Sequence, residues 1–160
     1  TVVDINQEML NTGRQKSFGK EHSEEIRWLQ ANAECLPIKD DHFDAYTTAF
    51  CIRNVTHIDR VLADARRVLK PGGKFMCLEF SHVVLPALEK LYDTYSFRIL
   101  PKLGELVAGD RDAYQYLAES IRQFPSQGAF AEMITAAGME QVKVRNLSGG
   151  IAAIHSAWRI

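Results

Sequence analysis

The sequence has 160 residues, 46% of them hydrophobic, which is enough apolar material for the core of one compact domain. Its 19 basic and 20 acidic residues nearly cancel, so no overall charge favours nucleic acid, and we expect no nucleic-acid partner. Cys35, Cys51 and Cys77 are widely spaced, which predicts free thiols and argues against a metal site or a disulfide framework.

Strands and helices are expected to alternate from the first residue. Residues 1–5 have the composition of a strand with no turn or cap before it, so we expect the sequence to begin inside a larger domain. Asn6 can cap a helix that runs to about Lys20, with Glu8 near its positive end. Residues 26–32 are the second expected strand.

The middle of the sequence predicts a loop and then two strands with a helix between them. Residues 33–42 have the composition of a loop, and residues 43–50, rich in aromatic and Thr residues, that of a third strand. Thr56 is the expected cap of an amphipathic helix, which Pro71-Gly72-Gly73 ends. The segment over 74–80 is short and mostly apolar, which predicts a parallel strand buried on both faces.

The last part predicts helices followed by a hairpin. Residues 84–124 hold two or three helices, more than a crossover needs, so we expect part of them to form a helical cap over the site. Ser126 begins a further helix that Gly138 ends. The strands over 142–147 and 151–158 are joined so briefly that they must be antiparallel. The expected fold class is α/β, with a doubly wound, Rossmann-like sheet that is mostly parallel and ends in an antiparallel hairpin.

Ligands of open α/β sheets bind beyond the carboxyl ends of the strands, so the strand ends hold the candidate site residues. Asp4 could accept hydrogen bonds from both hydroxyls of an adenosine ribose, or merely cap the next helix. Asn32, beside the small Ala33, could bind an adenine edge or simply form a turn. Arg53 could stabilise an anion, or form an ion pair with Glu79.

Three further side chains could move a proton. Glu79 could orient Arg53, accept a substrate proton or be solvated, and the sequence leaves these roles open. His57 and His155 could titrate near neutral pH, but a single histidine is more often structural than catalytic, and the side chain of His155 could point to the core or to the cleft. Four tyrosines are interpreted as core or cap aromatics: Tyr92, Tyr95, Tyr114 and Tyr116.

Several blocks of the sequence resemble the ubiquinone/menaquinone biosynthesis C-methyltransferase family, and in particular its 2-methoxy-6-polyprenyl-1,4-benzoquinol methylases. The resemblance covers essentially the whole sequence. The expected terminal hairpin agrees with it, because the methyltransferase version of the doubly wound fold has a final antiparallel strand. The blocks are Val3-Asp4-Ile5-Asn6, Asn32-Ala33-Glu34, Arg53-Asn54-Val55-Thr56, Arg67-Val68-Leu69-Lys70-Pro71-Gly72-Gly73, Leu78-Glu79-Phe80-Ser81 and the stretch from Tyr116 to Arg122.

The resemblance implies an enzyme that uses S-adenosylmethionine to methylate a ring carbon of a polyprenyl benzoquinol in ubiquinone biosynthesis. It implies that Asp4 binds the cofactor ribose, that Asn32 and Ala33 bind the adenine, and that Arg53 and Asn54 lie at the methyl-transfer site. Three alternatives stay open. They are methylation of demethylmenaquinol or another small molecule, a non-catalytic scaffold subunit of a quinone-synthesis complex and, ranked last, a nicotinamide-dependent dehydrogenase.

The expected chemistry needs an electron-rich ring carbon, which ionisation of a quinol hydroxyl provides. Arg53 has too high a pKa to act as the base, but its charge could hold the phenolate while Asn54 positions a water. The proton could leave through that water, His57 or Glu79. A polyprenyl tail needs apolar cover, for which the segment over 83–107 is a candidate, although plain helix packing explains it equally well. Its candidate side chains include Leu88, Leu91, Tyr92, Ile99 and Leu100.

Location and assembly follow from the resemblance as well. No apolar run is long enough to span a bilayer, so we expect a soluble or peripheral protein that can contact a membrane. We also expect a homodimer that joins a quinone-biosynthesis complex. The block over 53–59 favours the matrix side of the mitochondrial inner membrane, whereas a bacterial source would place the protein in the cytoplasm.

Two departures from the family pattern stand out. The single methyltransferase domain over 1–160 lacks the family's first strand with its glycine-rich loop, so this chain could bind cofactor poorly. Cys51 stands where relatives commonly have Gly, and its side chain would point either into the cofactor pocket or away from it.

Overall fold

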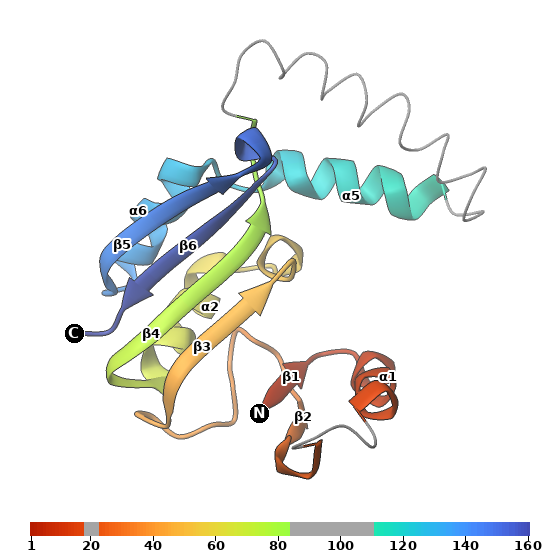
Figure 1. Ribbon diagram of the computed structural model, residues 1–160, viewed down its shortest axis with the longest axis vertical. Helices are drawn as coiled ribbons and strands as arrows, with labels where there is room; N and C mark the ends of the chain where they lie inside the picture. Colours follow the sequence, from red (N-terminus) through yellow and green to blue (C-terminus); the bar gives the residue numbers. More distant parts are fainter. Residues whose placement is uncertain (18–22, 84–110) are drawn as a thin grey trace.

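The computed structural model describes residues 1–17, 23–83 and 111–160, and it confirms the expected alternation of strands and helices there (Figure 1). Within these ranges, no helix is both long enough and apolar enough to cross a bilayer. In chain order the elements are β1 (Val2–Asp4), α1 (Gln7–Ser17), η1 (Ser23–Glu25), β2 (Trp28–Gln30), β3 (Phe43–Ala49), η2 (Ile52–Asn54), α2 (Ile58–Val68), β4 (Leu69–Phe80), α5 (Arg111–Gln123), α6 (Gln127–Ala136), β5 (Glu140–Leu147), η4 (Ser148–Gly150) and β6 (Ala152–Trp158), where η marks a short 3-10 helix.

The strands of the described residues lie in two sheets. β1 and β2 are parallel and form a sheet of their own, whereas the other sheet has the order β3-β4-β6-β5. β3 runs parallel to β4, and β6 runs antiparallel to both β4 and β5, which confirms the predicted hairpin. The expectation of a single continuous sheet is wrong here, because no strand pairing joins β1 to β3.

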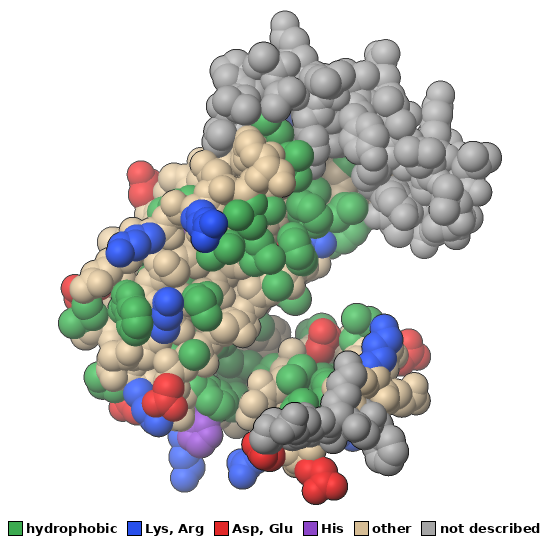
Figure 2. Space-filling model, viewed as in Figure 1, with side chains coloured by type: hydrophobic (Ala, Val, Ile, Leu, Met, Phe, Trp, Pro, Cys, Tyr) green, Lys and Arg blue, Asp and Glu red, His purple; other side chains and the backbone are tan. Residues whose placement is uncertain are grey.

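The apolar core lies on one face of the four-stranded sheet, which α2 and α6 both cover (Figure 1). Phe75 and Cys77 of β4 point to this face and are buried, while the alternate residues of β4 are only half-buried. The prediction that this strand is buried on both faces is therefore wrong in the described part of the chain. Figure 2 shows the other face, where Lys and Arg side chains stand among hydrophobic ones.

Helix α2 begins after the residue predicted to cap it. Its N-cap is His57, which makes no capping hydrogen bond with its side chain. Instead, Glu34 Oε1 accepts hydrogen bonds from the main-chain N–H groups of Thr56 at 3.0 Å and His57 at 3.1 Å. A carboxylate from a distant loop thus neutralises the positive end of the helix. The Asn6 cap of α1 is confirmed, because its Oδ1 accepts from the main-chain N–H of Glu8 at 2.8 Å.

Two arginines fix the other end of α2. Arg67 binds the loop over 33–42 by a salt bridge to Asp40 at 2.7 Å and a hydrogen bond to the carbonyl of Leu36 at 2.9 Å. Arg159 donates to the last carbonyls of the helix, including that of Arg66 at 3.1 Å. The loop that links the two sheets is therefore tied to α2, which sets β1 opposite β3.

Candidate functional site

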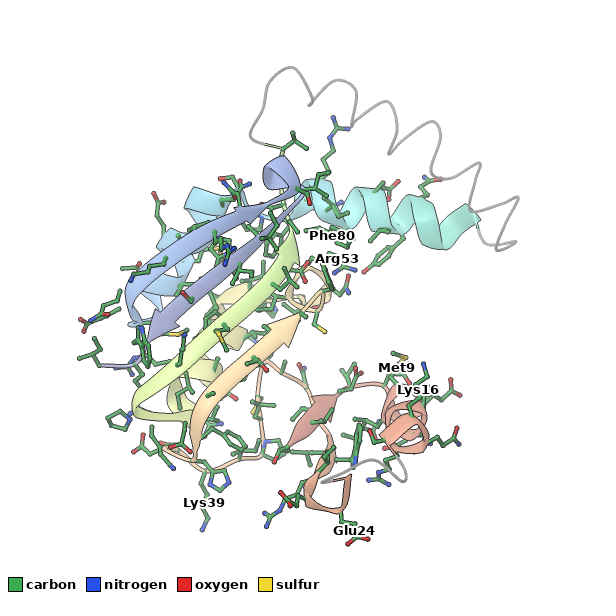
Figure 3. All side chains as sticks on the ribbon, in the orientation of Figure 1. Met9, Lys16, Glu24, Lys39, Arg53 and Phe80 are labelled. Carbon is green, nitrogen blue, oxygen red and sulfur yellow. The ribbon has the colours of Figure 1, made fainter. Side chains whose placement is uncertain are left out.

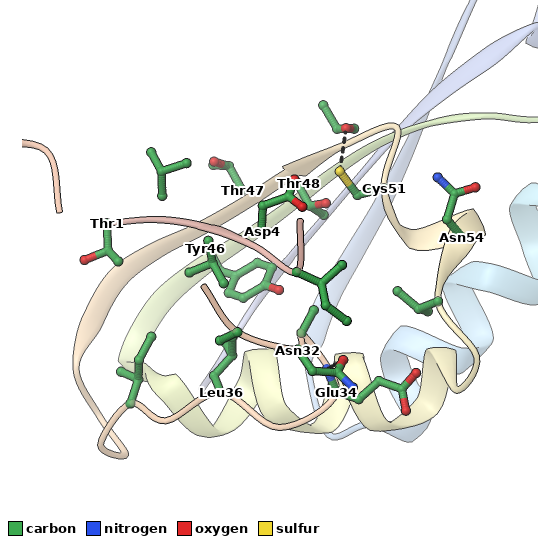
Figure 4. A pocket seen from close by; sticks show the side chains of 18 of the residues that line it. Thr1, Asp4, Asn32, Glu34, Leu36, Tyr46, Thr47, Thr48, Cys51 and Asn54 are labelled. Carbon is green, nitrogen blue, oxygen red and sulfur yellow. Dashed lines mark hydrogen bonds between the residues drawn. The ribbon is translucent and has the colours of Figure 1, made fainter. Parts of the chain in front are cut away.

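A pocket of about 650 Å³ lies between the two sheets, with β1 on one side and β3 on the other. Figure 4 shows it from close by, and Figure 2 shows the hollow between the N-terminal part and the four-stranded sheet. Such a volume is typical of a small-molecule site. The pocket is lined by residues 1–5, 31–34, 36, 38, 43, 45–49, 51 and 54–56.

Asp4 lies at the carboxyl end of β1, and Asn32 lies just beyond the carboxyl end of β2. Both residues line the pocket (Figure 4). Asp4 Oδ1 accepts a hydrogen bond from the main-chain N–H of Asn6 at 2.7 Å, and Asn32 Oδ1 accepts one from Glu34 at 2.9 Å. Both side chains therefore serve the local turns. Asp4 Oδ2 and Asn32 Nδ2 make no hydrogen bond with the described residues, so each side chain keeps a polar atom for a ligand.

The floor of the pocket near Asn32 is apolar. Ala33 lines the pocket and packs against the hydrophobic core, and the buried Leu36 lies just beyond it. A flat ring can lie against such small and aliphatic side chains. The predicted adenine residues Asn32 and Ala33 thus stand in the same cavity as Asp4.

Arg53 is not among the residues that line the pocket. Its Nη1 forms a salt bridge with Glu79 Oε2 at 3.1 Å and also donates to the carbonyl of Phe50, and its guanidinium lies 5.4 Å from the ring centre of Phe80 (Figure 3). Of the two alternatives left open for Arg53, the ion pair with Glu79 is therefore present, and the anion-stabilising role stays a prediction. The side chain of Arg53 is 11% exposed and that of Glu79 only 1%, so the cation is the outer member of the pair. Burial raises the pKa of Glu79, and the charge of Arg53 opposes that rise.

Asn54 does line the pocket, unlike its neighbour Arg53. Its Oδ1 accepts a hydrogen bond at 3.2 Å from the hydroxyl of Tyr116, which stands on α5. Tyr116 is 56% exposed, so it is not a core aromatic, and its alternative interpretation as a cap aromatic stays a prediction. The predicted pair Arg53 and Asn54 therefore splits between two environments.

Two directions were left open for the side chain of Cys51, into the pocket or away from it. The structure shows that it points into the pocket. Its thiol donates a hydrogen bond to the carbonyl of Ala49 at 3.2 Å (Figure 4). Burial raises the pKa of Cys51, and the nearby charges of Asp4 and Glu79 raise it further. The thiol is therefore neutral at physiological pH, and it forms part of the pocket wall.

The two candidate histidines lie outside the pocket lining. His57 is exposed at the start of α2. His155 points to the core, where its Nε2 lies 3.0 Å from the carbonyl oxygen of Gln127 and its ring packs edge-on against Phe130. Burial lowers the pKa of His155. Since its side chain faces away from the cavity, His155 cannot take a proton from a ligand bound there.

The pocket also contains residues that the sequence did not single out. Tyr46, Thr47 and Thr48 of β3 line it, and burial raises the pKa of Tyr46 to about 12. The Tyr46 ring stacks on Phe75 at a centroid distance of 5.8 Å. No sequence signal distinguishes a strand edge that faces a cavity from one that is paired, which is why these residues were missed.

The sequence model of the ubiE/COQ5 methyltransferase family matches residues 1–159. The chain belongs to this family. A ubiquinone/menaquinone biosynthesis C-methyltransferase UbiE of Brucella canis is 55% identical over all 160 residues, and one of Methylobacterium nodulans is 59% identical. The chain spans 60% and 63% of the lengths of these two relatives.

The fold comparison agrees with the family. A crystal structure of an S-adenosylmethionine-dependent methyltransferase from Thermotoga maritima, described as a possible histamine N-methyltransferase, superposes with a TM-score of 0.70. It covers 99% of this chain and 72% of the other chain at 19% sequence identity. The predicted class I methyltransferase fold is thereby confirmed, whereas this likeness says nothing about the substrate.

The pocket of this ubiE/COQ5 family member suits S-adenosylmethionine on three observations. Asp4 keeps one carboxylate oxygen for a ribose hydroxyl, Asn32 keeps its amide N–H groups for a ring nitrogen, and Ala33 leaves room for a flat base. Asn54 stands on the opposite stretch of the lining, after β3. The donor set thus fits an adenosine between Asp4 and Asn32.

Proposed function

We propose that the protein is an S-adenosylmethionine-dependent methyltransferase that methylates a ring carbon of a polyprenyl benzoquinol in ubiquinone biosynthesis. The observation that carries the proposal is the shared pocket of Asp4, Asn32 and Asn54 in a chain that belongs to the ubiE/COQ5 family. The acceptor is of the 2-methoxy-6-polyprenyl-1,4-benzoquinol type.

In this proposal Asp4 holds the cofactor ribose, and Asn32 with Ala33 holds the adenine. The bound cofactor supplies a methyl group that its sulfonium already activates, so the protein has to orient the acceptor and make its ring carbon nucleophilic. The neutral thiol of Cys51 and the protonated phenol of Tyr46 add no charge to the pocket. Of the two carboxylates in the lining, Glu34 already accepts the N–H groups at the start of α2, so the carboxylate of Asp4 is the one that faces the ribose.

Arg53 and Asn54 act on the acceptor. The side chain of Arg53 is more exposed than that of Glu79, and in this proposal its positive charge favours ionisation of a quinol hydroxyl bound near the ends of β3 and β4. Asn54 donates from its amide to that oxygen or to a water beside it. The hydroxyl proton leaves to this water, and the ring carbon, once methylated, loses its own proton to solvent.

Several finer features rest on the resemblance. Residues 84–124 contain the helical cap, and the segment over 83–107 covers the polyprenyl tail. Of residues 84–124 the structure describes α5, while residues 84–110 lie outside the described ranges. The protein forms a homodimer, joins a quinone-biosynthesis complex and contacts the membrane peripherally. The relatives reported above are bacterial and lend no support to the mitochondrial location, so we propose the bacterial alternative, the cytoplasm.

Methylation of demethylmenaquinol is the second candidate function. The relatives from Brucella and Methylobacterium are named for both ubiquinone and menaquinone biosynthesis, which favours this alternative over other small-molecule acceptors. Both quinols carry an ionisable ring hydroxyl beside the carbon that is methylated. The site described above would therefore act on either ring.

The test is transfer of an isotope-labelled methyl group by the complete protein to each of the two quinols. We expect label on a ring carbon of the benzoquinol, and loss of turnover by about a hundredfold in Arg53→Ala with little change in cofactor affinity. Arg60→Ala, which removes an exposed arginine of α2, is the matched control and should behave as the wild type. Transfer to neither quinol would sink the proposed reaction, and normal turnover in Arg53→Ala would remove Arg53 from it.

A further inference from the structure

The hydrogen bond between Tyr116 and Asn54 joins two distant parts of the chain at the pocket. Tyr116 stands on α5 and Asn54 at the end of η2, and the hydroxyl oxygen lies 3.2 Å from Asn54 Oδ1. The Tyr116 ring is largely exposed, so its position is not explained by burial in a core. An exposed aromatic side chain that reaches a residue of the pocket lining suggests a role in the site.

The side-chain amide of Asn54 can present either its oxygen or its NH₂ group to the pocket, since the two ends have the same shape. A phenol hydroxyl donates readily to an amide oxygen, and this hydrogen bond occupies Oδ1. Figure 4 shows the consequence, because the Asn54 nitrogen points to the side of Cys51 while the oxygen points away from it. The N–H donors are thus left for whatever lies in the pocket.

We propose that Tyr116 is a positioning residue that fixes the Asn54 amide so that its N–H groups face the acceptor oxygen. This inference rests on the proposed function, in which Asn54 donates to the ionising quinol hydroxyl. An amide free to turn would spend part of its time with its oxygen toward the phenolate, where the two would repel each other. Tyr116 therefore acts through Asn54 and need not touch the substrate.

The decisive variant is Tyr116→Phe, which deletes the hydroxyl and keeps the ring. We expect kcat to fall about three- to tenfold, the worth of one hydrogen bond, while cofactor affinity stays unchanged. Asn54→Ala should lose about a hundredfold, and the double variant should lose no more than Asn54→Ala alone. Gln115→Ala, whose side chain bonds Glu119 on the same helix, is the matched control and should leave kcat unchanged.

The pH dependence of kcat separates positioning from a merely structural role. Without an oriented N–H donor the bound quinol ionises less readily, so the rising limb of kcat should move to higher pH in Tyr116→Phe and in Asn54→Ala. An unmoved limb in Tyr116→Phe, or additive losses in the double variant, would overturn the role of Tyr116. Normal turnover in Asn54→Ala would instead overturn the proposed function of Asn54, so the two failures are distinguishable.

Discussion

His155 is a titratable side chain enclosed by the core, and this makes folding sensitive to pH. Burial lowers its pKa below the value near 6.5 that it has in the unfolded chain. The unfolded state therefore binds the proton more readily, so stability from this residue is complete above pH 6.5 and is lost as the pH falls toward the folded pKa. We expect a loss of up to about 1.4 kcal/mol per pH unit over that window.

Urea unfolding at several pH values, with His155→Gln beside the wild type, measures this contribution. The variant should unfold with a flatter pH dependence below pH 6.5, whatever its absolute stability. Equal slopes for the two proteins would show that folding leaves the pKa of His155 unchanged.

At the residue scale, the sequence predicted positions better than directions. Asp4, Asn32 and Asn54 were found because strand ends of α/β folds meet at one edge, and all three share the pocket. The side chain of Arg53 is held by Glu79 of β4 and by the carbonyl of Phe50. The sequence does not show whether Arg53 binds these partners or a ligand.

Among the elements, α2 depends on a cap from a distant loop. Glu34 accepts the N–H groups of Thr56 and His57, which no side chain at the N-cap does. Glu34→Ala should therefore lower the free energy of unfolding by about 1 kcal/mol. Urea unfolding checks this, and Glu132→Ala at an exposed position of α6 is the control. An equal, small effect of both substitutions would mean that Glu34 does not support the helix.

The type of each element could be predicted from the sequence. Which strands pair with each other, and which residues cap a helix, could not. The hairpin of β5 and β6 was predicted from the short connection between its strands. Helix α2 was predicted from apolar residues that recur at helical spacing. Which strands hydrogen-bond across a sheet depends on edges that lie far apart in sequence, so the division between β1 and β3 was not foreseen. The same holds for the helix cap, because Glu34 and Thr56 are 22 residues apart.

At the scale of the whole molecule, the pocket is a property of the two sheets together. β1 and β3 each pair with one described strand only, and both line the cavity, so neither sheet forms the site alone. The loop that Arg67 ties to α2 keeps them opposed. Cofactor affinity therefore reports on the arrangement of the entire fold.

Calorimetric titration of the complete protein with S-adenosylmethionine tests this arrangement most directly. Asp4→Ala should bind at least about tenfold more weakly, since a charge-assisted hydrogen bond to the ribose is lost. Asp59→Ala, which removes an exposed carboxylate in the first turn of α2, should bind as the wild type does. Unchanged affinity in Asp4→Ala would contradict the proposed placement of the adenosine between Asp4 and Asn32.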